Sequence, residues 1–521
     1  MESLTDQLEE EAEAYFQKVD EMGGVIAAIE DGFFQREIAR SAFEYEKKIN
    51  DKSRIVVGVN DFIKEDEEIE IPILKIGKEA EEDQNAKLKA LRNTRDPQSV
   101  KLALDNVRKV ASSEQNLMPP LIKAAHAGAT LGEIVIEMKK VFGEKDFIGG
   151  NPWGGISADP KKGVVFLTTG NPKPNYVGTS RPGKNLFANS IIAFDIRNKK
   201  KLWHFQETCH DLWNLDIPSP PILTTINKYD RRIDVVVAVT KLGNTIILDS
   251  NSGDPIFDYE MRLAPISKIP GEKTCKYQPS LKLPEPFAKN IFKKEDVTNL
   301  SKSSEDYILS ILENSNYGFF QTHELNKYTI EYNMQGGAQW TGASVNPYNN
   351  VMYVTANNIA WKVGVQTYKK KSRFKYTDKK EEPLRDLEGY PGTKPPWGTL
   401  TAINLNTGKI IWQVPLGHYK ELKSLKIKTG TENFGGAMGT SGGLVFAAGT
   451  LDKLIRAFDS ETGEELWSYE LPYIGSAPPT SYEVNDEQYI VIPATGGITL
   501  KINYGDLVEL GDAVVAFKIQ D

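Results

Sequence analysis

One stretch of this chain occurs twice, at a constant offset along the sequence. The first copy begins at Gly149 and reads GGNPWGGISADPKKGVVFLTTGN, and the second begins at Gly336 and reads GGAQWTGASVNPYNNVMYVTANN. The copies align without a gap and share their glycine pair, a Trp, a Ser, a Pro, an apolar run that ends in Thr, and a closing Asn. A duplicated β unit of this size is typical of solenoids and propellers, in which one supersecondary unit is stacked repeatedly.

A second, shorter pattern recurs and favours a propeller over a solenoid. Each copy has an apolar strand that runs into Asp or Asn, a polar turn that usually holds Gly, and a second strand that ends on a large ring. The four copies are Asp195–Trp203, Asp249–Phe257, Asn404–Trp412 and Asp459–Trp467. Their spacing is about one four-stranded propeller blade, and we expect each ring to pack between neighbouring sheets. An ordinary β-sandwich with chance Trp positions is the alternative.

The first part of the chain, residues 1–143, has a different character. It is acidic, and apolar residues recur at helical spacing in ESLTDQLEEEAEAYFQKVDEM, in DGFFQREIARSAFEYEKKI, and over residues 80–112 and 121–144. One β-rich run, RIVVGVN at 54–60, interrupts the helices. Because a single strand cannot bury its own sheet, we interpret this part as an incomplete α/β unit. The expected domains are 1–145 and 146–521.

The composition excludes several classes of protein. With 40% hydrophobic and 26% charged residues among 521, the chain is expected to be a soluble globular protein with room for two domains. The net charge of -8 argues against a nucleic-acid partner, and no apolar run is long enough to predict a membrane span. The start, MESLTDQLEEE, is unlike a signal peptide and predicts a cytoplasmic location. Cys209 and Cys275 are too few for a disulfide framework.

The two parts resemble two different families. Residues 149–500 resemble the later blades of the quinoprotein alcohol and glucose dehydrogenases, which depend on pyrroloquinoline quinone (PQQ). Residues 1–143 resemble the end of the catalytic barrel of the methylmalonyl-CoA mutase large subunit, in segments such as VVGVNDF and NLMPPLIKAAHAGATLGEI. The resemblances imply a mainly β chain with about five of eight blades of a quinoprotein-type propeller. A mostly helical α/β fragment of a TIM-barrel mutase domain would precede these blades.

The quinoprotein resemblance implies a site for PQQ and Ca²⁺. In that family a Trp forms the floor on which the flat quinone stacks, and Trp153 matches it. The alternative is a blade-packing ring. Asn171 matches the family's Asn ligand to Ca²⁺, with an ordinary turn residue as the alternative. The segment of Asn433, Phe434 and Gly435 resembles the blade whose backbone closes over the edge of the cofactor.

The positions that the resemblance implies for catalysis are altered. The family's general base is usually the Asp of an HDxWD pattern, but here that position holds Asn214, and an amide cannot take a proton from an alcohol. Asp211 and Asp216 lie nearby, and each is either a substitute base or a structural turn acid. Lys241 matches the family's cation beside the quinone oxygens, where a positive charge stabilises the reduced quinone. A solvated lysine is the alternative there.

The implied activity is oxidation of an alcohol or of a sugar hydroxyl. In the family Ca²⁺ polarises the quinone carbonyl, a carboxylate removes the hydroxyl proton and a hydride passes to the ring. Roughly three blades of the family's propeller have no counterpart here, so the resemblance implies an incomplete or impaired enzyme. Family members usually work in the periplasm, whereas mutases work in the cytoplasm.

The mutase-like part lacks the family's earlier barrel strands and its cobalamin-binding DxHxxG loop. We therefore expect no cobalamin binding, and at most a contact surface for mutase subunits on residues 1–145. Three interpretations stay open. The chain is a PQQ-type dehydrogenase without its front blades, a mutase-associated binding scaffold with a non-catalytic propeller, or a chimeric join of two truncated genes that carries a mutase-related isomerase fragment.

Overall fold

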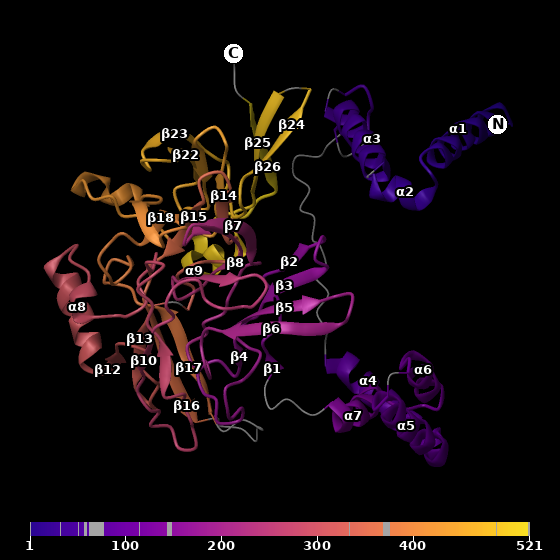
Figure 1. Ribbon diagram of the computed structural model, residues 1–521, viewed down its shortest axis with the longest axis horizontal. Helices are drawn as coiled ribbons and strands as arrows, with labels where there is room; N and C mark the ends of the chain where they lie inside the picture. Colours follow the sequence, from indigo (N-terminus) through magenta and orange to yellow (C-terminus); the bar gives the residue numbers. More distant parts are fainter. Residues whose placement is uncertain are drawn as a thin grey trace. The chain divides into compact units, whose positions relative to one another are not determined.

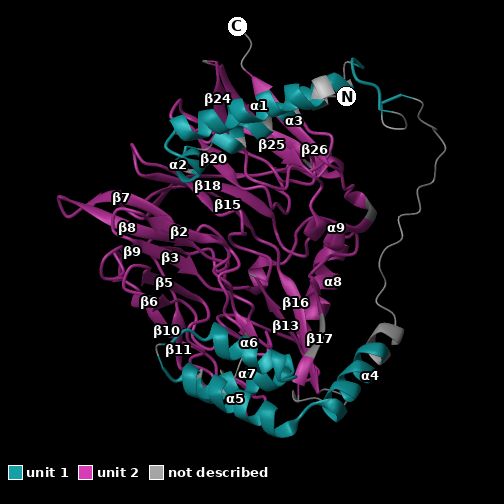
Figure 2. Ribbon diagram, turned by 90° about the vertical axis from the view of Figure 1, so that its right-hand side faces the viewer, with its two compact units in different colours: residues 1–142 teal, residues 143–521 magenta. Residues whose placement is uncertain are grey.

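The chain folds into two compact units, residues 1–142 and 143–521 (Figure 1, Figure 2). The computed structural model describes residues 2–31, 33–50, 52–56, 60–61, 78–113, 115–142, 148–332, 334–367, 376–485 and 487–518. Unit 1 is helical, and unit 2 is built mainly from antiparallel sheets. The boundary expected at residue 145 lies outside the described residues. Among those described, none of the helices combines the length and the apolar character that a membrane span needs.

Unit 1 consists, in its described part, of helices joined by turns and loops. They are α1 (Glu2–Glu21), α2 (Val25–Glu30), α3 (Phe33–Asn50), α4 (Lys78–Thr94), α5 (Pro97–Ala111), α6 (Met118–His126) and α7 (Leu131–Phe142). A small core forms where α5, α6 and α7 meet, around Val107, Ala124 and Ile134. The β-rich run at 54–60 forms no strand at Arg54–Val56 or at Asn60, and residues 57–59 lie outside the described part.

Polar contacts at the start of α5 help to hold this small core together. Asp96 accepts hydrogen bonds from the backbone N–H groups of Gln98 and Ser99, at 3.1 Å each, and thereby caps the helix. Arg95 forms an ion pair with Glu133 of α7 at 2.6 Å. This contact, outweighing partial burial, lowers the pKa of Glu133 to about 2. The pair therefore ties the start of α5 to α7.

Five sheets of unit 2, among its described residues, repeat one antiparallel meander, and we call them blades A to E in chain order. Blade A consists of β2 (Ile156–Asp159), β3 (Val164–Thr168), β5 (Ser190–Asp195) and β6 (Lys200–Gln206), and blade B of β7 (Ile222–Lys228), β8 (Arg231–Val239) and β9 (Thr245–Asp249). Blade C consists of β14 (Ala343–Asn346), β15 (Val351–Asn357), β18 (Gly398–Asn404) and β19 (Lys409–Pro415). Blade D consists of β20 (Ala437–Gly439), β21 (Leu444–Ala447), β22 (Leu454–Asp459) and β23 (Glu465–Glu470), and blade E of β24 (Thr480–Val484), β25 (Glu487–Ala494) and β26 (Ala513–Lys518). Within each blade the strands lie side by side in the order in which they occur along the chain, as in propellers.

Further elements lie between the strands and blades. They are β1 (Ile148–Gly149), β4 (Pro172–Lys173), β10 (Met261–Leu263), β11 (Tyr277–Pro279), η1 (Lys294–Asp296), α8 (Lys302–Glu313), β12 (Ser315–Tyr317), β13 (Tyr328–Glu331), β16 (Trp361–Thr367), β17 (Tyr376–Pro383), η2 (Lys420–Leu425), α9 (Ile498–Tyr504) and η3 (Gly505–Leu507). The largest insertion is a separate sheet of β12, β13, β16 and β17, whose first pair is parallel. Its strands β16 and β17 interrupt blade C between β15 and β18.

The large rings of the hairpins pack on the next blade, as their position in the repeat predicts. Trp203 of blade A lies on Gly253 of blade B, so that an added Cβ at Gly253 would come within 2.5 Å of the indole ring. Trp412 of blade C lies on Gly463 of blade D in the same way, with a Cβ distance of 2.7 Å. Each indole Nε1 also donates to a backbone carbonyl in the next blade, at 3.2 Å from Trp203 and 3.1 Å from Trp412. Trp467 of blade D differs, because it stays 39% exposed.

Apolar clusters lie between each pair of successive blades. One joins Phe166 of blade A to Val236 of blade B, and the others join blades B and C, C and D, and D and E. Such inter-sheet cores between radially arranged sheets are what a propeller requires. The expectation of a partial propeller of about five blades is therefore confirmed.

The inner ends of the blades also touch one another. A Cβ added at Gly154, just before β2, would lie 2.2 Å from the carbonyl oxygen of Pro218, just before β7. Gly342, just before β14, approaches Ser219 in the same region, and Gly436, just before β20, approaches Thr341. The segments that enter blades A to D thus form one continuous surface, and the candidate site lies on it.

Replacing Gly253 by Ala is expected to destabilise unit 2 by about 2–4 kcal/mol, because the new Cβ both clashes with Trp203 and must adopt a φ of 78°. Gly183→Ala is the matched control: Gly183 has a φ of 89°, but an added Cβ there meets no atom within 4 Å. We expect the control to cost only about 1–2 kcal/mol. Chemical denaturation of both variants measures the difference, and equal losses would contradict the ring-on-glycine contact.

Candidate functional site

Four segments at the inner ends of blades A and B supply the candidate site. Trp153 precedes β2, Asn171 follows β3, Asp216 lies in the extended connection between β6 and β7, and Lys241 lies in the turn between β8 and β9. Gly243 has a φ of 74° and donates its N–H to the carbonyl of Thr240, which closes that tight turn. The sequence therefore places residues far apart in the chain on one surface.

Three of the residues predicted for the site contact the carboxylate of a fourth, Asp216. Lys241 Nζ donates to Oδ2 at 2.7 Å, while the backbone N–H of Asn171 and the indole Nε1 of Trp153 donate to Oδ1 at 2.8 and 3.1 Å. Burial acts to raise the pKa of Asp216, but the charge of Lys241 and these hydrogen bonds outweigh it and lower that pKa. Asp216 is thus an ionised carboxylate that holds Lys241 and Trp153 in place.

The indole of Trp153 combines a fixed position with an accessible surface. Its edge is held by Asp216, and a Cβ added at Gly170 would lie 2.8 Å from Nε1, so the ring rests against bare backbone. The residue is nevertheless 44% exposed. Its counterpart in the repeat, Trp340, is 39% exposed. Both rings are therefore more exposed than Trp203 and Trp412, which are 9% exposed between their blades.

Asp211 has a structural position. It is fully buried, and its carboxylate accepts hydrogen bonds from the backbone N–H groups of Trp213 and Leu215, at 2.7 Å each, and from Asn189 Nδ2 at 2.9 Å. Burial raises the pKa of Asp211 despite these bonds. The carboxylate therefore shapes the turn around Asn214 and has no surface for a substrate.

Asn214 lies where that turn meets Lys241. Its backbone carbonyl accepts a hydrogen bond from Lys241 Nζ at 3.0 Å, and its φ of 60° lies in the left-handed region, which Asn and Asp tolerate best among residues with a side chain. The side chain is an amide, so it holds the position of the expected base without the basic group.

The segment of Asn433, Phe434 and Gly435 lies at the entry of blade D and is tied to blade C. Asn433 donates through its backbone N–H to Asn357 Oδ1 at 2.9 Å, and Gly435 packs against the backbone of blade D itself. Phe434 stacks on Trp340, with ring centroids 5.0 Å apart. Within the described residues this segment contacts Trp340 and Asn357, and not the group around Asp216.

Buried polar residues behind this surface were not singled out by the sequence. His210 Nε2 contacts Glu272 at 2.7 Å, with both side chains fully buried. Glu207 accepts from Thr240 Oγ1 at 3.0 Å and from Asn244 Nδ2 at 2.9 Å, and burial raises its pKa to about 7. The residue pattern around Glu207, QETCHD, does not distinguish a buried acid from an exposed one, so the burial of Glu207 could not be predicted from the sequence.

The donor set fits a flat quinone better than a calcium ion. A half-exposed, fixed indole beside a lysine offers a stacking face and a positive charge. Ca²⁺ needs six to eight oxygen ligands, usually with several carboxylates. Among the described residues no group of three or more His, Cys, Asp or Glu side chains has a metal-binding arrangement, and both oxygens of Asp216 already accept N–H groups. The expected calcium site at Asn171 is therefore incomplete.

The two cysteines, too few for a framework, do form one disulfide. Cys209 and Cys275 are 66 residues apart in sequence, with their Cα atoms 6.0 Å apart. Gln278 Nε2 donates to the carbonyl of Cys209 at 2.7 Å beside the bond. The disulfide therefore fastens the loop between β10 and β11 to the segment that leads directly into residues 210–216.

Removing this disulfide by the double change Cys209→Ser and Cys275→Ser is expected to lower the free energy of unfolding by about 2–4 kcal/mol, because the open chain gains conformational freedom. A reductant should lower the melting temperature of the unchanged protein in the same way and leave the double variant unaffected. A reductant effect of equal size on both proteins would contradict a stabilising disulfide.

Comparison with known proteins adds the following findings. The family model for the glucose/ethanol/alcohol dehydrogenase β-propeller domain matches residues 137–490, and that for methylmalonyl-CoA mutase matches residues 1–144. Quinoprotein glucose dehydrogenase A of Acinetobacter calcoaceticus is 28% identical over 411 residues, which cover 71% of this chain and 49% of the relative. Probable quinate dehydrogenase (quinone) of Xanthomonas campestris pv. juglandis is 30% identical, covering 71% and 50%.

A further relative and a solved structure have similar coverage. The glycerol dehydrogenase large subunit of Gluconobacter oxydans is 28% identical, with 71% of this chain and 54% of the relative covered. The crystal structure of quinohemoprotein alcohol dehydrogenase from Comamonas testosteroni aligns with a TM-score of 0.46 and 22% identity over 67% of this chain and 45% of that one. The chain thus spans about half the length of the curated relatives it matches.

Proposed function

We propose that the chain binds PQQ on Trp153 and slowly oxidises a hydroxyl-bearing small molecule. The chain belongs to the β-propeller family of PQQ-dependent glucose, ethanol and alcohol dehydrogenases. The observation that carries the proposal is the contact group around Asp216, which fixes an exposed indole beside a buried lysine. A cofactor that is flat and gains negative charge on reduction matches both of its parts.

Trp153, Asp216 and Lys241 would have different roles in binding the cofactor and in the reaction. Trp153 provides the stacking face, and Asp216 fixes both its edge and the ammonium group of Lys241. Bound PQQ supplies the two-electron acceptor for the hydride that leaves the hydroxyl-bearing carbon. Lys241 holds a positive charge where negative charge develops. None of these residues takes up the hydroxyl proton.

Slow turnover follows from that missing step. Asn214 is an amide, Asp211 is fully buried, and the pKa of Asp216 is lowered by Lys241 against the effect of burial. A general base contributes about 10²–10⁴-fold to such reactions. Proton transfer must then go to water, and the rate is correspondingly low.

The test is reduction of an artificial electron-acceptor dye by the full chain with added PQQ and with ethanol, glycerol or glucose. We expect a slow rate that requires PQQ and that falls at least about tenfold in Trp153→Ala, because stacking is lost. Trp203→Phe, at a ring between blades, is the control and should keep the rate. Dye reduction that does not depend on PQQ, or that is equal in Trp153→Ala, would overturn the proposal.

The disulfide between Cys209 and Cys275 indicates in which cellular compartment the protein resides. Disulfides persist in oxidising compartments and are rare in the cytosol, so Cys209–Cys275 supports a location outside the cytoplasm, against the expectation drawn from the start of the sequence. We therefore propose an oxidising compartment for this propeller. Mass spectrometry of the alkylated protein from its native source would show both cysteines joined, and free thiols there would contradict this location.

We propose, second, a contact with mutase subunits through residues 1–145. The match of residues 1–144 to the methylmalonyl-CoA mutase model supports it. Several apolar side chains on the helices of unit 1 are exposed, among them Leu102, Ile122 and Leu131. Co-purification with a cobalamin-binding mutase subunit would support this contact, and recovery of the chain alone would oppose it.

A further inference from the structure

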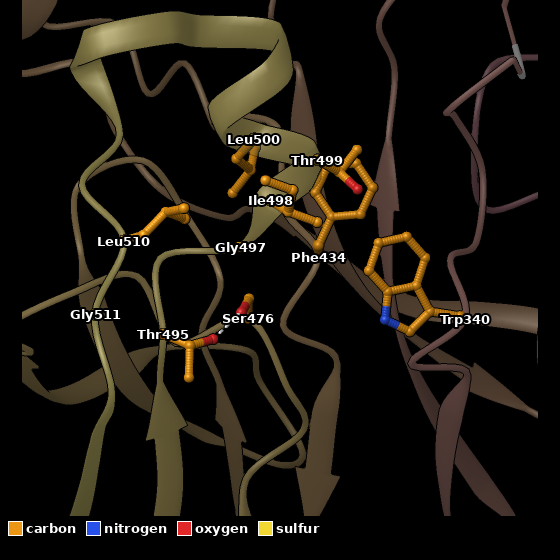
Figure 3. Close-up of a pocket in the computed structure, with 10 residues that line it drawn as sticks. All are labelled: Trp340, Phe434, Ser476, Thr495, Gly497, Ile498, Thr499, Leu500, Leu510 and Gly511. Atoms are coloured by element: carbon orange, nitrogen blue, oxygen red, sulfur yellow. Dashed lines mark hydrogen bonds between the residues drawn. The ribbon is translucent and has the colours of Figure 1, made fainter. Parts of the chain in front are cut away.

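A cavity of about 430 Å³ lies beside the ring of Trp340 (Figure 3). Trp340 and Phe434 form one wall, with the two rings nearly parallel. The other walls come from the β25–β26 connection, which contains α9, and from Ser476 in the segment between β23 and β24. The lining residues outside the ring pair are Ser476, Thr495, Gly497, Ile498, Thr499, Leu500, Leu510 and Gly511. The volume is in the usual range for sites that take a small organic ligand.

The chemistry of the lining is apolar with a few hydroxyl groups. None of the ten lining residues carries a charge. Ser476 and Thr495 hydrogen-bond each other through their hydroxyls at 3.0 Å, on the side away from the rings in Figure 3. Thr499 adds a further hydroxyl to the lining. Such a lining cannot balance the charge of an anionic ligand, and it cannot satisfy the many hydroxyls of a sugar.

Backbone geometry keeps the cavity open. Gly497 has a φ of 79°, and a Cβ added there would lie 3.0 Å from the side chain of Ser476. A Cβ added at Gly511 would lie 2.2 Å from the ring of Tyr473. Both glycines therefore let the β25–β26 connection approach the segment between β23 and β24 closely enough to form a wall.

The sequence repeat relates this cavity to the proposed quinone site. Trp340 is the counterpart of Trp153 in the duplicated cassette, and both rings are half-exposed at the entry to a blade. The Trp340 segment also touches the lysine of the proposed site: the N–H of Ala338 donates to the carbonyl of Thr240 at 3.1 Å, and a Cβ at Gly337 would lie 2.1 Å from the carbonyl oxygen of Lys241. Trp340, which lines the cavity, is thus three residues after Gly337, whose backbone contacts the Lys241 turn.

Trp340 also lines a second hollow, of about 620 Å³, together with residues from the inner ends of blades A and B such as Ser157 and Pro220. The ring therefore stands between the cavity and the surface where blades A, B and C meet. Trp340 is thus shared by the two hollows.

We propose that the cavity beside Trp340 binds a neutral alcohol with an apolar body, aliphatic or aromatic, and that this is the substrate class of the chain in place of a sugar or a hydroxy acid. The assignment to substrate rests on the proposed function. The apolar body packs against Trp340, Phe434 and Ile498, and the single hydroxyl is within the reach of the hydroxyl groups of the lining.

The test measures binding without any quinone, by saturation-transfer NMR and calorimetry on the full chain with benzyl alcohol, 1-hexanol, glycerol and glucose. Benzyl alcohol and 1-hexanol are expected to bind, and glycerol and glucose are expected neither to bind nor to compete. Ile498→Asn should weaken binding at least about tenfold, because it places an amide in the apolar wall. Ile502→Asn is the matched control, since Ile502 lies on the same helix, is 76% exposed and does not line the cavity.

Trp340→Ala is the second variant and should weaken binding by a similar factor with the melting temperature retained, because the ring is 39% exposed. Absence of binding by both alcohols, competition by glucose, or an equal loss in Ile502→Asn would overturn the proposal. Trp153→Ala separates the two claims, since it should lose PQQ binding and keep benzyl alcohol binding. Alcohol binding in a chain that binds no PQQ would support the cavity and overturn the proposed dehydrogenase.

Discussion

Replacing Asn214 by Asp is expected to raise the PQQ-dependent oxidation rate by about 10²–10⁴-fold, the contribution of a positioned general base. The new carboxylate would occupy the position at which the family usually carries its base, beside a backbone carbonyl that already contacts Lys241 Nζ at 3.0 Å. The left-handed φ of 60° at this position suits Asp as it suits Asn, so the backbone need not change. Initial rates of dye reduction with saturating PQQ measure the effect.

Asn214→Gln is the matched control for that variant, because it keeps the amide and lengthens the side chain. Its rate should stay at or below that of the unchanged protein. The rate of Asn214→Asp should fall as the pH drops below the pKa of the new carboxyl, since only the ionised form accepts a proton. An unchanged rate in Asn214→Asp at neutral pH would show that the missing base is not what limits this chain.

Replacing Lys241 by Met is expected to destabilise unit 2 by about 3–5 kcal/mol, because it leaves the carboxylate of Asp216 buried without its charged partner. Both side chains of the pair are over nine-tenths buried, and their nitrogen and oxygen atoms are 2.7 Å apart. The free energy of unfolding from denaturant titration at pH 7 measures the loss.

The pH dependence of that loss has a definite sign. The folded pKa of Asp216 is lowered from 3.8, so the stabilisation by Lys241 is present above that value and disappears as the pH falls through the folded pKa. The difference between Lys241→Met and the unchanged protein should therefore shrink in acid. Lys162→Met is the control: the Lys162–Asp234 pair is more exposed and 3.4 Å long, and its loss should cost at most about 1 kcal/mol. Equal losses in the two variants would contradict a buried, stabilising pair.

Much of the fold was predictable because repeats record it directly. The turn from Asp249 to Phe257 and its three relatives fix the length of a hairpin, and a glycine such as Gly253 provides the space for the ring of the previous blade. Blade A shows the limit of this pattern: its hairpin has Lys199, with a φ of 54°, in the place of that glycine. Trp467 is similar, because its neighbour blade E has no such hairpin, and its ring stays partly exposed.

The site was predictable in its parts but not in its connections. The matched residues Trp153, Asn171 and Lys241 do meet, yet the residue that joins them is Asp216, for which the sequence left a substitute base and a structural turn acid as alternatives. Charge alone does not distinguish Asp216 from Asp211 in the sequence. Their roles depend on which N–H groups face them, and that is set by backbone turns far apart in the chain.

The elements outside the repeats could not be anticipated in the same way. The strands β12, β13, β16 and β17 form a separate sheet, and β16 and β17 interrupt blade C between β15 and β18. The disulfide joins Cys209 to Cys275 across 66 residues, and two isolated cysteines in a sequence do not reveal whether their Cα atoms come within bonding range. Long-range pairing of this kind is a property of the packed fold.

The account rests on the claim that Trp153 and its neighbours form a quinone-binding floor on an incomplete propeller. Equilibrium dialysis of the full chain against PQQ tests that claim most directly. We expect about one PQQ bound per chain, and an affinity at least about tenfold lower in folded Trp153→Ala. Failure of the unchanged protein to bind PQQ, or equal affinity in the variant, would contradict the account.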